Sequence, residues 1–186
     1  LDNQQIIDLK NEVQFNFYDF TFKYFQKIGS KNKISLDLIS VNDQLNVYQE
    51  TNNSAGIFSQ NNTLYQKNKG GNLTFERFWN AKNTTKINLF VSDYELEAEQ
   101  LKIQNLQNIH QENAVLDTGL KIENKHILSP TFEFNNGYQF NEIGVTNLDE
   151  LNAPKYFKQS KSVLRTHALI LEGKFKDSQS KIIINT

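Results

Sequence analysis

Several residue types and patterns are missing from this chain of 186 residues, and each absence excludes a class of site or segment. There is no cysteine, which excludes disulfides, thiolate metal sites and thiol catalysis. There is no methionine either, not even at position 1, so we expect the chain to be a piece of a longer precursor. No run of about 18 apolar residues and no signal peptide occurs. A membrane anchor is therefore expected only in a segment that is absent here.

The charge balance argues against nucleic acid as a partner. Lys and Arg number 20 against 21 Asp and Glu, so the net charge is -1 and no global positive field exists. Hydrophobic residues make up 38% of the chain and aromatic residues 12%, which is too much apolar mass for a disordered protein. The length suits one folded domain.

The opening of the chain has the spacing of an amphipathic helix. Apolar residues recur there at intervals of three or four, namely Ile6, Leu9, Val13, Phe17, Phe20, Tyr24 and Ile28. Asp2 can cap such a helix and Gly29 can end it, so we predict a helix over residues 1–29. An alternative is open, because Val13, Phe15 and Phe17, and then Phe20, Phe22 and Tyr24, also alternate with polar residues as two half-buried strands would.

The remaining residues, 30–186, have the pattern of an antiparallel meander. Short alternating runs are separated by turn signals, which we place at Asn42-Asp43, Gly70-Gly71, Ala98-Glu99 and Asn136-Gly137. We expect loops over 105–113 and 146–154, and two closing strands over 163–175 and 181–184 joined at Asp177-Ser178. The predicted fold class is α+β, with the N-terminal helix packed on a β-rich body in a single domain. The alternative fold is an all-β sandwich.

No motif in the chain predicts catalysis, a cofactor or a metal. The three histidines lack ligand spacing, and no phosphate-binding loop or nucleophile elbow is present. Asp93, Glu95, Glu97 and Glu99 alternate, so on a strand they share one face, which we interpret as solvated rather than as a calcium site. We therefore expect a protein that is not an enzyme and has no catalytic, cofactor-binding or metal-binding residues.

Trp79 lies in an aromatic cluster with Phe75, Phe78 and Arg77. We expect these rings to pack in the core. A sugar-stacking or cation-π patch is the alternative if Trp79 faces outward.

The order of helix, polar connection and β-meander resembles the soluble part of type IV pilin-like proteins, especially minor pseudopilins of the J type in type II secretion. The segments that carry this resemblance are 9–13 through 28–29, 73–77, 91–96 with 101–103, 132–138 and 168–172. In that family an apolar helix precedes this region and anchors the precursor in the inner membrane. The resemblance implies a periplasmic or cell-surface location and other pilin or pseudopilin subunits as partners.

These observations predict a noncatalytic structural subunit of a pilus or secretion pseudopilus. Its expected partner interface is the apolar side of the helix, at Val13, Phe17, Phe20 and Tyr24. The alternative function is a β-sandwich surface binding module, such as a lectin or adhesin. One helix over residues 6–28 would favour the first function, and strands there would favour the second.

Overall fold

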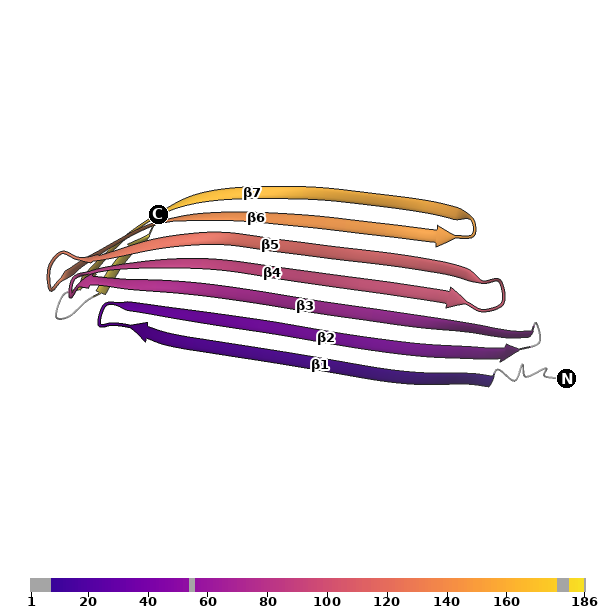
Figure 1. Cartoon of the computed structure of the whole chain (residues 1–186). Coiled ribbons are helices and arrows are strands. Elements are labelled where there is room, and N and C mark those ends of the chain that lie inside the picture. Colours follow the sequence, from indigo (N-terminus) through magenta and orange to yellow (C-terminus); the bar gives the residue numbers. More distant parts are fainter. Residues whose placement is uncertain (1–7, 54–55, 177–180, 186) are drawn as a thin grey trace.

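The computed structural model, which describes residues 8–53, 56–176 and 181–185, is one antiparallel sheet of eight strands (Figure 1). Each strand pairs with its neighbours in the chain, so the spatial order from β1 to β8 is the sequence order. The strands are β1 (Asp8–Ile28), β2 (Asn32–Asn53), β3 (Gly56–Asn80), β4 (Asn83–Lys102), β5 (Gln107–Ile127), β6 (Phe132–Asn152), β7 (Lys155–Lys176) and β8 (Lys181–Asn185).

The seven long strands have 20 to 25 residues each, several times the usual strand length of about 5–6 residues. Short turns connect them alternately at two ends of the sheet. We call the end with turns 29–31, 81–82 and 128–131 the proximal end, which lies on the left in Figure 1. The other end, with turns 103–106 and 153–154, is the distal end.

The part of the chain that the structure describes forms no second layer and no hydrophobic core. Among the described residues no hydrophobic side chain is buried, and many large apolar side chains are more than half exposed, such as Phe17 at 72%. The described residues contain no helix of the length and hydropathy needed to cross a membrane. The expectation of an all-β fold is therefore nearer to the structure than α+β, but a sandwich would need a second sheet.

The helix predicted over residues 1–29 is wrong in its described part, because residues 8–28 form the continuous strand β1. Residues 1–7 of that prediction fall outside the described residues. The helical spacing arose where the alternation changes phase. Val13, Phe15 and Phe17 occupy odd positions, whereas Phe20, Phe22 and Tyr24 occupy even ones. Joining the two runs produces intervals of three and four that imitate a helix. The resemblance to pilin-like proteins is wrong for the same reason, since that fold begins with this helix.

Four predicted turns lie inside strands: Asn42-Asp43 in β2, Gly70-Gly71 in β3, Ala98-Glu99 in β4 and Asn136-Gly137 in β6. Cross-strand pairing continues through each of these pairs and overrides their local turn preference. Neighbouring side chains lie beside the glycines of β3: a Cβ on Gly71 would be 3.3 Å from Leu38 Cδ2.

The predicted loops over 105–113 and 146–154 are mostly strand in the structure. Only the short turns at 103–106 and 153–154 lie outside the strands there. The predicted strand over 163–175 lies within β7, and 181–184 lies within β8. The join predicted at Asp177-Ser178 falls outside the described residues.

Candidate functional surface: a sheet with two exchanged faces

The pairing register assigns the residues of the long strands to two faces, apart from the end of β3, where the register shifts between Phe78 and Asn80. Directly paired residues point to the same side of a sheet, and successive residues point to opposite sides. Face A therefore carries the even residues of β1, β2, β5 and β6 and the odd residues of β3, β4 and β7. Face B carries the remaining residues.

Face A is apolar in the proximal half of the sheet. One register row reads Tyr24, Leu36, Leu73, Leu89, Leu120, Phe140 and His167 across seven strands. We call the whole set the apolar band: Tyr18, Phe20, Phe22, Tyr24, Ile34, Leu36, Leu38, Leu73, Phe75, Ile87, Leu89, Val91, Leu116, Leu120, Ile122, Tyr138, Phe140 and Leu169. More than half of these side chains are exposed and none is buried. The band is therefore an apolar surface that no other described part of the chain covers.

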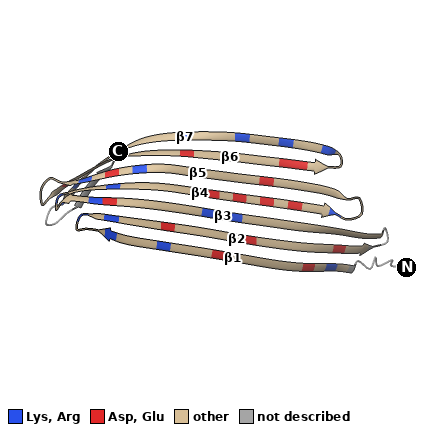
Figure 2. Cartoon of the chain, viewed as in Figure 1, with Lys and Arg blue, Asp and Glu red and all other residues tan. Residues whose placement is uncertain are grey.

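Face B is polar in the same proximal half. One row reads Lys33, Glu76, Lys86 and Glu123 on β2 to β5, so the charges alternate in sign. Lys33 Nζ lies 3.4 Å from Glu76 Oε2. Figure 2 shows these charges gathered toward the proximal ends of the central strands.

Glu133 on β6 is the centre of a denser charged cluster on face B. Its carboxylate lies 2.7 Å from Lys125 Nζ and 3.6 Å from Lys174 Nζ, and it accepts a hydrogen bond of 3.2 Å from Asn135. Glu172 accepts a hydrogen bond of 2.6 Å from Asn135, and its carboxylate lies 2.9 Å from Lys174 Nζ. This network surrounds an open hollow of about 290 Å³.

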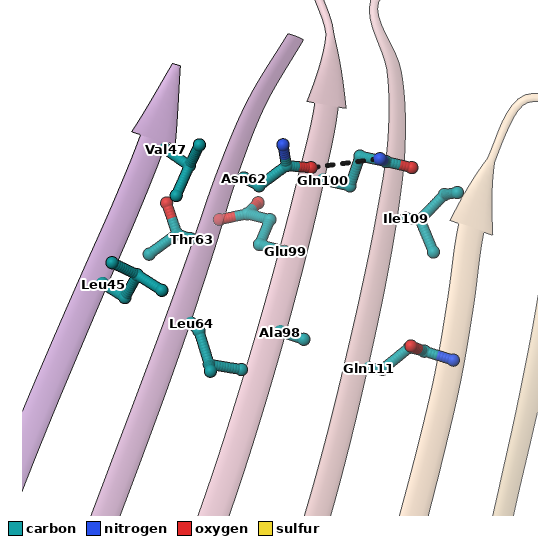
Figure 3. A pocket seen from close by; sticks show the side chains of 10 residues that line it. All are labelled: Leu45, Val47, Asn62, Thr63, Leu64, Ala98, Glu99, Gln100, Ile109 and Gln111. Carbon is teal, nitrogen blue, oxygen red and sulfur yellow. Dashed lines mark hydrogen bonds between the residues drawn. The ribbon is translucent and has the colours of Figure 1, made fainter. Parts of the chain in front are cut away.

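The apolar residues change sides in the distal half of the sheet. Val13, Phe15 and Phe17 of β1 lie on face B, beside Leu45 and Val47 of β2. A shallow hollow of about 460 Å³ lies here, lined by apolar side chains and by amides (Figure 3). Gln100 donates a hydrogen bond of 3.0 Å to Asn62 across β3 and β4.

Face A is correspondingly polar in the distal half and carries the acidic row of β4. Asp93, Glu95, Glu97 and Glu99 share this face, as the alternation predicted, and they form the row of acids on β4 in Figure 2. Three of them have partners on adjacent strands. Lys67 lies 3.3 Å from Glu95, and His110 lies 3.8 Å from Glu97. Asn108 donates a hydrogen bond of 2.7 Å to Glu99. In the part of the chain that the structure describes, no group of acids and histidines could hold a metal.

Trp79 is 52% exposed, so the expected core packing is wrong. The Arg77 guanidinium lies over its ring at 4.2 Å, and its Nε1 donates 2.9 Å to Thr85 Oγ1. The hydrogen bonds continue from Thr85 to Asn124, 2.8 Å, and from Asn124 to Asn136, 3.0 Å. This polar row crosses β3 to β6 at the proximal edge of the apolar band.

The four residues predicted as one interface do not lie together. Val13 and Phe17 are on face B in the distal half, while Phe20 and Tyr24 are on face A in the proximal half. Sequence reasoning missed both the apolar band and the charged cluster around Glu133. The adjacent pair Phe17-Tyr18 was the available signal, because two neighbouring aromatic residues on a strand face opposite sides.

No protein-family model and no curated protein matches this chain. Among solved structures, the ferric yersiniabactin uptake receptor FyuA from Yersinia pestis is similar, with a TM-score of 0.53 at 9% sequence identity. The similarity covers 98% of this chain and 29% of the receptor chain. At this identity the likeness concerns the fold: a long-stranded antiparallel meander.

Proposed function

We propose that this sheet is part of the wall of a membrane-embedded, closed antiparallel barrel whose interior admits or binds a polar solute. The observation that carries the proposal is the apolar band on face A directly behind the charged face B. A water-soluble sheet would bury that band against a second layer, and the described residues provide none.

The dimensions of the band fit a bilayer. On β1 it extends over residues 18–28, about 11 residues, which at about 3.4 Å per residue is about 37 Å along the strand. It is shorter on β4, where face A becomes acidic at Asp93 in the register row of Phe20. With a tilt of about 45° the length on β1 spans about 26 Å, close to the band about 25 Å tall of outer-membrane barrels. Lipid would contact face A in the proximal half.

Face B would line the interior. It carries the charged row on β2 to β5 and the cluster around Glu133. Burying these charges against lipid would cost free energy, whereas a hydrated interior solvates them. The distal half, where face A is charged, would extend beyond the bilayer into water.

The edges of the sheet also support a closed structure. The outer edge of β1 has no paired strand among the described residues, and β8 pairs only with residues 172–176 of β7. Unpaired backbone groups are very costly in lipid, so these edges would pair with further strands.

The function named for the similar structure suggests what the interior does. That protein is a ferric yersiniabactin uptake receptor, and this chain spans 29% of its length. We extend to this chain only the class of function, binding and uptake of a small solute at a cell surface. This is closer to the surface binding module expected as the alternative than to a pilus subunit, whose assembly rested on the absent helix. That the protein is not an enzyme stays a prediction.

Single cysteines test the orientation, because the chain has none of its own. We would introduce Phe22→Cys or Leu89→Cys on face A and Thr21→Cys or Asn88→Cys on face B. Each variant would carry an environment-sensitive fluorophore in vesicles that contain spin-labelled lipid tails. The face A labels should be quenched and the face B labels should not.

Gln14→Cys is the matched control, since it lies on face A in the distal half and should escape quenching. Equal quenching of neighbouring positions such as 21 and 22 would overturn the proposal.

A further inference from the structure

One cation on the lipid-facing side of the sheet has no acidic partner. The region in question is face A from the register row of Tyr24 and His167 to the proximal end of the sheet. Within the described strands β1 to β7, Arg77 is the only Arg, Lys, Asp or Glu in this region. No carboxylate of the described residues lies within ion-pair distance of it, and its Nε has no hydrogen-bond partner. Its cross-strand neighbour is Asn32, whose Oδ1 also lacks a partner.

The surroundings of Arg77 have the composition of a membrane interface. Its guanidinium carbon lies over the Trp79 ring, 4.2 Å from the ring centroid, and the polar row through Thr85 and Asn124 continues at the same level. Tryptophan and arginine with apolar residues on one side and water on the other are typical of the headgroup level. The apolar band begins one face-A position away, at Phe75.

We propose that Arg77, with Trp79, binds the phosphate of a phospholipid headgroup at the proximal edge of the apolar band. The guanidinium offers several N–H donors in a planar fork that matches phosphate oxygens. The phosphate supplies the negative charge that the described residues of face A do not provide near Arg77. The inference rests on the proposed function, because it requires face A to meet lipid.

Trp79 is the only tryptophan in the chain and therefore reports its own surroundings. The protein would be reconstituted in vesicles of a phosphate-free diacyl betaine lipid, with increasing fractions of brominated phosphatidylglycerol or of the brominated betaine lipid. Quenching of Trp79 by each brominated lipid gives its relative binding constant at this position.

The wild-type protein should favour phosphatidylglycerol, and Arg77→Gln should lower that preference about fivefold, as expected for one basic residue near an anionic lipid surface. Arg77→Lys should keep part of it, because a point charge remains but the fork is lost. Lys86→Gln is the matched control: it removes one positive charge at a similar level from face B and should leave the preference unchanged.

Failure of this inference and failure of the proposed function give different results. Equal quenching by both lipids in the wild type and in Arg77→Gln would overturn the phosphate site and leave the membrane orientation intact. No quenching by either lipid, with full quenching by aqueous iodide, would overturn both.

Discussion

Glu133 is one of two buried polar residues in the described part of the chain, with 9% of its surface exposed. Its ion pairs with Lys125 and Lys174 connect β5, β6 and β7. We expect Glu133→Gln to lower the free energy of unfolding by about 1 kcal/mol at pH 7, since the pairs remain partly in contact with water. Chemical unfolding of the protein in detergent micelles measures this. Glu12→Gln, in the exposed pair with Lys10, is the control and should have almost no effect.

Gly119 is required by close packing rather than by its backbone conformation. A Cβ at this position would overlap the Phe90 ring and lie 2.9 Å from the Phe140 carbonyl oxygen. Gly119→Ala should cost about 1–3 kcal/mol of unfolding free energy, as overpacked substitutions do. Gly144→Ala is the control, because its nearest neighbour, Leu116 O, is 3.9 Å away. Adding Phe90→Ala to Gly119→Ala should restore part of the lost unfolding free energy. If Gly119→Ala costs the same with and without Phe90→Ala, the clash with the Phe90 ring is refuted.

At the scale of the strand, the two faces should tolerate charge differently. Phe22 and Thr21 are neighbours on β1 that face opposite sides. Phe22→Lys should destabilise the protein by about 2–4 kcal/mol in lipid, whereas Thr21→Lys should cost little. Unfolding in phospholipid vesicles measures the difference. Equal costs would mean that face A does not contact lipid.

The strands also explain which turn signals failed. Asn136-Gly137 is a strong hairpin pair in isolation, yet it lies inside β6 and pairs with Asn124 and Glu123. Local propensity contributes about 1 kcal/mol at most, whereas a strand of more than 20 residues is held along its whole length by two neighbours. The turns that did form include one at Gly29, whose φ of 62° is in the region that glycine favours.

At the scale of the whole molecule, we expect a sheet whose described residues bury no hydrophobic core to need an amphiphile to stay dispersed. Upon dilution from urea into plain buffer the chain should aggregate through its apolar band and open edges. In detergent micelles it should recover strand structure and remain dispersed. Circular dichroism and sedimentation measure both outcomes. A monomer that unfolds cooperatively in plain buffer would contradict the absence of a second layer.

The sequence by itself determined the β-rich body, the closing strand over 163–175, the shared face of the four acids on β4 and the lack of a catalytic motif. Each of these depends on alternation or composition, which are local properties. The prediction of a helix over residues 1–29 failed because the apolar residues change from odd to even positions at Phe17-Tyr18. After that change the same residues fit the helical spacing as well as the alternation of a strand.

Only the tertiary structure decided that β1 is one strand, that Val13 and Phe17 lie opposite to Phe20 and Tyr24, and that Glu133 meets Lys174 41 positions further along the chain. These facts depend on the register between strands, which is set by many weak pairings along more than 20 positions. No short stretch of sequence determines that register. The change of side of the apolar residues is therefore seen only in the assembled sheet.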